Sequence, residues 1–116
     1  MGPAPMTEDE LLVGLVELLG LTGWRVYHVR RSDRAILQGR GGDGFPDIVA
    51  VHPERSRMVA IECKTDNGLP TPAQLEWLFA MRQHSTLEVT IVRPSTYDAA
   101  IAWLQGLGPM PDARVR

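Results

Sequence analysis

Two short apolar runs separated by a polar turn set the strongest limit on how this chain can fold. The runs are Ile48–Val51 and Met58–Ile61, and turn-forming residues lie between them. Apolar runs of this length that are rich in Val and Ile are typical of β-strands. The sequence therefore predicts a β-hairpin at the centre of the chain. Pairing that is symmetric about the turn sets Val51 opposite Met58 and Val49 opposite Ala60.

The same hairpin gathers ionisable side chains at one end. Its register sets Asp47 opposite Glu62, and the alternation of side chains along a strand places Lys64 on the face of Glu62 and Cys63 on the other. Opposed residues have Cβ atoms about 4.5–5.5 Å apart, which is close enough for two carboxylates to share one cation. A hard divalent ion would relieve their repulsion, and a neighbouring ammonium can orient a water or offset phosphate charge. The pattern is suited to the hydrolysis of phosphodiesters.

These residues resemble a known nuclease signature. Pro46-Asp47 followed by Glu62-Cys63-Lys64 resembles the PD-(D/E)xK motif, and the wider pattern GFPDIVAV with IECKTDNGLPTPAQLEWL resembles the VRR-NUC branch (virus-type replication-repair nuclease). Gly44 before the Pro-Asp pair, Gly68 in the turn after Lys64 and Gln74 in the next helix support the match. The resemblance covers roughly residues 7–104. It implies an α/β fold with a restriction-endonuclease-like core, in which helices flank a mixed four-stranded sheet.

The resemblance also implies a function. It predicts a DNA endonuclease that depends on Mg²⁺ or Mn²⁺, with Asp47, Glu62 and the backbone carbonyl of Cys63 as metal ligands and Lys64 acting on the attacking water. Stand-alone members of this kind resemble phage or bacterial enzymes that form homodimers and cut branched DNA such as Holliday junctions. Two alternatives remain open. One is a nickase or a nuclease for flaps and ends, and the other is a catalytically silent module that only binds DNA.

The first helix offers two acids for an accessory role. Thr7 and Glu10 form a capping box before a leucine stripe, so the cap explains Glu10. Glu8 is spaced to share the face of the leucines, and the family pattern places an acid at the start of this helix. We therefore expect Glu8 to be an accessory ligand of metal or water. The alternative is a favourable charge at a helix N-terminus.

Gln74 has two possible roles. Thr71, Pro72 and Gln74 fit the N-cap, N1 and N3 positions of a second helix, so a capping box explains Gln74 structurally. The resemblance places the same glutamine near the active site, and both roles are compatible. We expect Leu75, Leu78 and Phe79 to form the core stripe of this helix.

The remaining elements complete the order α-β-β-β-α-β-α. Residues 24–29 and 87–92 are expected to be strands, and a last helix over residues 96–105 is expected to be capped by Ser95 and Asp98. His28 is most simply a strand histidine, although relatives with a His at this position suggest that it could assist. We expect residues 1–6 to be a disordered lead, residues 7–105 the nuclease domain and residues 106–116 a flexible tail.

A loop rich in Arg and Gly, from Arg30 to Gly44, precedes the hairpin. Arginine side chains in such a loop are suited to contact DNA phosphates, and the alternative is a solvated surface loop. The candidate DNA-binding residues are Arg30, Arg31, Arg34 and Arg40.

Composition agrees with a single domain inside a cell. A chain of 116 residues with 44% hydrophobic residues can form one modest core, and it has no apolar run long enough to span a membrane. The single cysteine excludes an internal disulfide and fits a reducing cytoplasm. The resemblance implies that this is the cytoplasm of a bacterial or phage-infected cell. The three histidines have no spacing suited to zinc. Eleven of the twelve basic residues are Arg, so Lys64 is the only lysine.

Overall fold

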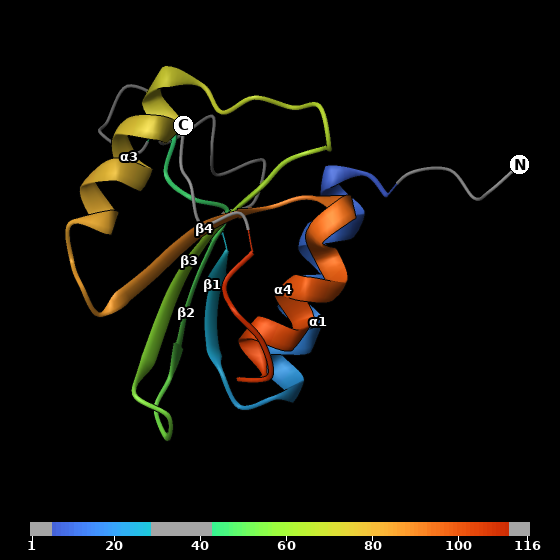
Figure 1. The fold of residues 1–116 in the computed structure, drawn as a ribbon, viewed down its shortest axis with the longest axis vertical. Helices are drawn as coiled ribbons and strands as arrows, with labels where there is room; N and C mark the ends of the chain where they lie inside the picture. Colours follow the sequence, from blue (N-terminus) through green and yellow to red (C-terminus); the bar gives the residue numbers. More distant parts are fainter. Residues whose placement is uncertain (1–5, 29–42, 112–116) are drawn as a thin grey trace, which may run out of the picture.

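The computed structural model describes residues 6–28 and 43–111, which form a mixed four-stranded sheet with helices on both faces (Figure 1). The predicted α/β class and the order of elements are confirmed, with one short 3-10 helix added before the last helix. The elements are α1 (Glu8–Leu21), β1 (Arg25–His28), β2 (Ile48–His52), β3 (Arg57–Cys63), α3 (Pro72–Arg82), β4 (Leu87–Val92), η1 (Pro94–Thr96) and α4 (Tyr97–Leu104).

The sheet has the order β1-β2-β3-β4. Strands β2 and β3 form the predicted antiparallel hairpin, and the register confirms the pairs Val51–Met58 and Val49–Ala60. Strand β1 pairs with β2 in antiparallel orientation, whereas β4 runs parallel to β3. Parallel neighbours need a crossover connection. Helix α3 supplies that crossover, and it therefore begins at the end of the sheet where β3 ends.

Both helices that were expected to carry capping boxes do so. The Thr7 hydroxyl accepts from the backbone N–H of Glu10 at 3.1 Å, and Glu10 accepts in return from the N–H of Thr7 at 3.0 Å. The same reciprocal pair joins Thr71 and Gln74 at 3.2 and 2.8 Å. These bonds satisfy donors that a helix N-terminus otherwise leaves unmatched. Local sequence therefore determines where α1 and α3 begin.

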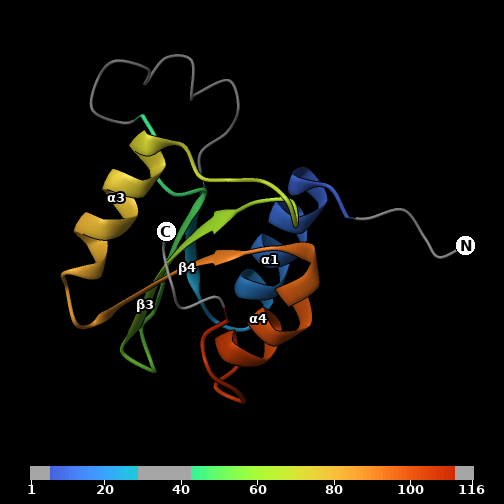
Figure 2. The ribbon, with the colours of Figure 1, turned by 45° about the horizontal axis from the view of Figure 1, so that its top comes forward.

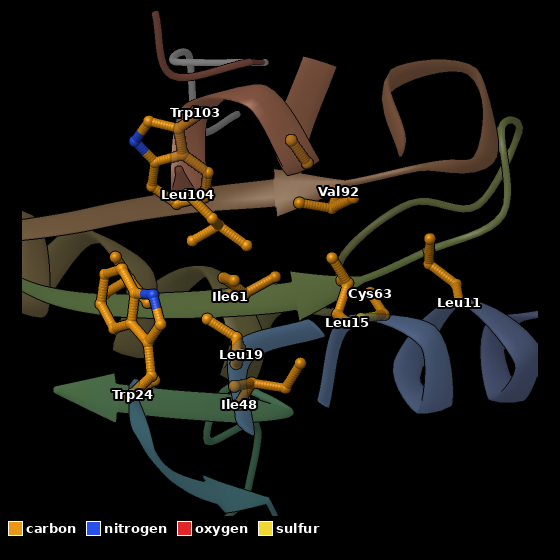
Figure 3. Packing of buried hydrophobic residues seen from close by; sticks show 13 residues of the cluster. Leu11, Leu15, Leu19, Trp24, Ile48, Ile61, Cys63, Val92, Trp103 and Leu104 are labelled. Atoms are coloured by element: carbon orange, nitrogen blue, oxygen red, sulfur yellow. The ribbon is translucent and has the colours of Figure 1, made fainter. Parts of the chain in front are cut away.

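The two faces of the sheet carry separate cores. Helices α1 and α4 lie together on one face and α3 lies on the other (Figures 1 and 2). Figure 3 shows the larger core, in which Leu15 and Leu19 of α1 pack over Ile61 of β3 and Trp103 of α4 covers the far end. The smaller core, under α3, is built from Ala60, Leu78, Val89 and Ile91. Burying each large aliphatic side chain stabilises the fold by about 1.5–3 kcal/mol.

Two local predictions were wrong. Phe79 is 46% exposed and does not join the core, because α3 buries Leu78 as its one fully enclosed residue among those described. No side chain caps α4 from Ser95 or Asp98. Instead, the backbone N–H of Ser95 donates to Asp66 Oδ1 at 2.9 Å, so a tertiary contact takes the place of the local one.

The predicted domain limits stay a prediction, but chain beyond the last helix packs on the body of the protein. Met110 lies against the larger core, and the carbonyl oxygen of Pro111 accepts a hydrogen bond from the buried Thr90 hydroxyl. Met6, before α1, also packs on the larger core. Over residues 6–28 and 43–111, no helix has the length and apolar character that crossing a membrane requires.

Candidate active site

Asp47 lies just before β2, and its carboxylate is tied to the neighbouring strand. It is only 5% exposed, and Asp47 Oδ2 accepts a hydrogen bond of 2.8 Å from the backbone N–H of Cys63. A charge-assisted bond from a backbone donor is stronger than a neutral one and fixes the carboxylate in place. The hairpin thus holds Asp47 beside the last residue of β3, as its predicted register requires.

Glu62 lies on the α3 side of the sheet. Its neighbours Ile61 and Cys63 belong to the larger core on the α1 side, whereas Ala60 belongs to the core under α3. Because side chains alternate along a strand, Glu62 shares the face of Ala60. It is 1% exposed. A carboxylate this deeply buried requires partners of opposite charge or hydrogen-bond donors.

Gln74 connects α3 to that carboxylate. Its Oε1 accepts from the N–H of Thr71, which completes the helix cap, and its Nε2 donates to Glu62 Oε2 at 2.7 Å. A carboxamide has an acceptor at one end and donors at the other, so both contacts form at once. The two roles considered for Gln74 are therefore compatible in structural terms, since the cap orients the amide that contacts Glu62.

Lys64 supplies the cation of the group. Its side chain is 11% exposed, and Lys64 Nζ lies 3.6 Å from Glu62 Oε2. That separation is longer than the usual 2.7–3.2 Å of an N–H···O hydrogen bond. The ammonium is thus near Glu62 and is not locked to it. Cys63, between the two, is a buried free thiol at 1% exposure, as expected for an inert strand cysteine.

Gly44 allows the segment leading to Asp47 to lie directly on the start of α3. Its φ is +79°, and a Cβ added there would come within 2.4–2.6 Å of backbone atoms of Ala73 and Gln74. Backbone atoms cannot move aside as the end of a flexible side chain can, so only glycine fits. This close approach joins the segment that carries Asp47 to the helix that carries Gln74. Next to it, the rings of Phe45 and Trp77 meet edge to face at 5.0 Å.

The site holds two buried carboxylates, those of Asp47 and Glu62, and the ammonium of Lys64 lies near Glu62. In the described part of the chain, no group of three or more His, Cys, Asp or Glu side chains is placed to hold a metal ion. Oxygen donors of this kind suit Mg²⁺, which takes one or two carboxylates and keeps several waters. The donor set therefore fits a hydrated hard cation and does not fit an all-protein cage.

Glu8 belongs to α1, which is a different element from those that carry the residues above. Glu8 lies in the first turn of α1 and is exposed to solvent, whereas Leu11, one turn later, is fully buried. Its accessory role stays a prediction. His28 pairs with Ile48 in the sheet, next to the strand end that carries Asp47, and its role is likewise a prediction. The candidate DNA-binding residues Arg30, Arg31, Arg34 and Arg40 lie outside the described residues.

One side chain beside the site was not singled out from the sequence. Arg93, just after β4, donates from Nη1 to the carbonyl oxygens of Thr65 and Gly68 at 2.7 and 2.6 Å. Those residues form the turn that follows Lys64. An arginine before a proline at a strand end carries no local signal for such contacts, because its partners lie far away in the sequence.

Comparison with known proteins identifies the fold. No family model and no curated protein sequence matches the chain. A solved structure described as a VRR_NUC domain protein aligns with a TM-score of 0.57 at 17% identity, covering 97% of this chain and 100% of its own. A second, described as a VRR_NUC domain, aligns with a TM-score of 0.53 at 21% identity, covering 81% and 89%. The resemblance found in the sequence is thus confirmed at the level of the fold, and the chain has the fold of the VRR-NUC domain.

Proposed function

We propose that this protein is a metal-dependent endonuclease that hydrolyses phosphodiester bonds in DNA. The observation that carries the proposal is the placement of two buried carboxylates, Asp47 and Glu62, at the end of the central hairpin, with the ammonium of Lys64 near Glu62. Carboxylate oxygens are ligands that suit Mg²⁺, and a bound divalent cation would compensate the cost of burying them. The VRR-NUC fold of the two structural neighbours supports the same assignment.

The proposed ligands are the carboxylates of Asp47 and Glu62 and the backbone carbonyl of Cys63. When bound, Mg²⁺ or Mn²⁺ would polarise a phosphoryl oxygen and make a water molecule more acidic. The hydrogen bond from the Cys63 N–H orients Asp47, and the amide of Gln74 orients Glu62. Removing a partner that orients a metal ligand in this way commonly weakens metal binding by about 10–100-fold.

Lys64 is proposed to act on the reacting groups themselves. Its ammonium is near Glu62 without being locked to it, so it can turn toward a water or a phosphate oxygen. There it would orient the attacking water and offset negative charge that develops on the phosphate. A compact ammonium on a flexible stem suits this task better than a guanidinium, and Lys64 is the only lysine of the chain.

We further propose that the substrate is branched DNA, in particular a four-way junction, and that two copies act together. A two-fold pair would present two sites suited to symmetric cuts. The mass in solution, measured by light scattering, tests this part, and a monomer at working concentration would contradict it.

In the same proposal Glu8 supports the metal from α1, and Arg30, Arg31, Arg34 and Arg40 contact the phosphate backbone. Replacing those four arginines with Ala should weaken DNA binding and lower its salt dependence, and unchanged binding would contradict their role.

The central test is cleavage of labelled four-way junction, flap, duplex and single-stranded DNA in Mg²⁺ and in Mn²⁺. Wild type, Asp47→Ala and Lys64→Ala should be compared, with Glu76→Gln as a control because Glu76 is an exposed acid of α3. We expect metal-dependent cutting that Asp47→Ala and Lys64→Ala abolish and the control retains. If wild type cuts nothing, and it binds DNA equally with and without EDTA, the protein is a binding module and the proposal fails.

A further inference from the structure

The segment between Lys64 and Gln74 connects two side chains that meet at one carboxylate oxygen. Lys64 Nζ and Gln74 Nε2 both face Glu62 Oε2, at 3.6 and 2.7 Å. Residues 65–71, between β3 and α3, run past the start of α4 and return to α3 (Figures 1 and 2). The segment contains no strand or helix. The segment links Lys64, directly after β3, to the start of α3, which carries Gln74.

Arg93 holds the first part of this segment. The N–H of Gly68 donates to the carbonyl of Thr65 at 3.1 Å, which closes a turn over residues 65–68. Inside that turn, Arg93 Nη1 contacts the carbonyl oxygens of Thr65 and Gly68 at 2.7 and 2.6 Å and that of Asp66 at 3.4 Å. One guanidinium nitrogen thus contacts three carbonyl oxygens. A guanidinium is planar and always charged, so it loses little freedom on making such bonds.

Two more bonds fasten the same region to the chain around Arg93. The backbone N–H of Lys64 donates to the carbonyl of Val92 at 3.1 Å, which extends the parallel pairing of β3 and β4 by one step. Asp66 Oδ1 accepts from the N–H of Ser95 at 2.9 Å, and this bond lowers the pKa of Asp66. Residues 92–95 therefore contact Lys64 and the turn that follows it.

We propose that Arg93 is a positioning residue, which fixes the 65–68 turn and thereby holds Lys64 and Gln74 against Glu62. Its effect on catalysis rests on the function proposed above, but its effect on the Lys64 side chain does not. Arg93 binds the backbone of the turn and attracts the Asp66 carboxylate within it.

The single lysine of the chain allows a direct test. Protein grown with isotope-labelled lysine gives one lysine side-chain NMR signal, that of Lys64. In metal-free protein we expect Arg93→Ala to shift this signal and to make the side chain more mobile, and we expect Arg93→Lys to restore part of the wild-type behaviour. The matched control is Arg55→Ala, because Arg55 Nη1 also donates to a carbonyl, that of Gln105, at 3.1 Å. The control should leave the Lys64 signal unchanged.

A second variant keeps the test decisive if Arg93→Ala fails to fold. Asp66→Ala removes the bond from Ser95 and the attraction between the Asp66 carboxylate and Arg93, and it changes an exposed side chain. It should shift the Lys64 signal in the same direction by a smaller amount. An unchanged Lys64 signal in folded Arg93→Ala would overturn the proposal, and where that variant does not fold, an unchanged signal in folded Asp66→Ala would do so.

The kinetic arm separates positioning from general stability. Small misplacements of catalytic groups cost rate more than binding, so Arg93→Ala should lower kcat by about 10–100-fold while KM and DNA affinity stay near wild type. A rise in KM alone would contradict the proposal. If wild type cleaves no DNA with any metal, the proposed function fails, and the NMR comparison still decides the role of Arg93.

Discussion

The two ends of β3 each carry a largely buried ion pair, but the pairs are built differently. At the start of the strand, Arg57 binds both carboxylate oxygens of Glu88 at 2.8 Å and donates to the carbonyls of Trp103 and Leu104 at 3.1 and 3.2 Å. Trp103 Nε1 also donates to Glu88, and the guanidinium lies 5.2 Å from the Trp24 ring centroid. At the other end, Lys64 stands 3.6 Å from Glu62, and Asp47 adds a second carboxylate.

The two pairs differ in how tightly the cation is held. The Arg57–Glu88 pair is bidentate and lies beside aromatic rings, and it attaches α4 to the sheet. Lys64 lies near Glu62 at a distance longer than a usual hydrogen bond, so its ammonium keeps the freedom that the proposed reaction needs. Natural proteins tend to lose stability where a site must bind or react. The looser geometry at the Glu62 end therefore supports the site proposed there.

The largest expected effect comes from removing one site charge while keeping its shape. Glu62→Gln can still accept from Gln74 but cannot balance a divalent cation. Metal-based charge stabilisation is worth several kcal/mol, and about 1.4 kcal/mol corresponds to tenfold in rate, so cleavage should fall on the order of 10³-fold. Urea denaturation should show unfolding free energy equal to wild type or higher. If Glu62→Gln instead lowers the free energy of unfolding with little loss of cleavage rate, the charges at the Glu62 end of β3 have a structural role.

Removing the cation of the other pair should lower stability and leave the cleavage rate unchanged. Arg57→Met leaves the Glu88 carboxylate partly buried without its partner, and breaking a buried pair in this way costs about 3–5 kcal/mol. We expect the lower end of that range because the Glu88 side chain is 33% exposed. Cleavage per folded molecule, measured well below the melting temperature, should remain near wild type. Arg55→Ala is the control. If it lowers the free energy of unfolding as much as Arg57→Met does, the contacts of Arg57 stabilise the protein no more than those of Arg55.

The smallest expected effect is the dependence of stability on pH. Burial by itself would raise the pKa of Glu88, but hydrogen bonds from Arg57 and Trp103 outweigh it and hold the pKa below its usual 4.5. A carboxyl with a lowered pKa contributes stability above about pH 4.5, and that contribution is lost as pH falls through the lower, folded value. Solvent screening keeps it to about 1 kcal/mol or less. Unfolding midpoints measured from pH 6 to pH 3 should fall more steeply for wild type than for Glu88→Gln, and parallel curves would contradict this origin.

Local patterns in the sequence accounted for the frame of the site. The period-two alternation of the hairpin decided its register, and with it the placement of Asp47 near the end of β3. The capping boxes at Thr7 and Thr71 decided where α1 and α3 begin. These predictions succeeded because each depends on residues only a few positions apart or directly paired across a turn.

Packing decided the rest, because it joins residues whose separation leaves no local trace. The bond from Gln74 to Glu62, the exposure of Phe79, the replacement of the α4 cap by Asp66 and the binding of the 65–68 turn by Arg93 all arise between different elements. By itself, the sequence predicted the residues that are proposed to carry the chemistry, and it determined the hairpin that brings Asp47 near the end of β3. Only the tertiary structure decided which donors orient Glu62 and hold the segment that carries Lys64, since hydrogen bonds between elements depend on how those elements pack.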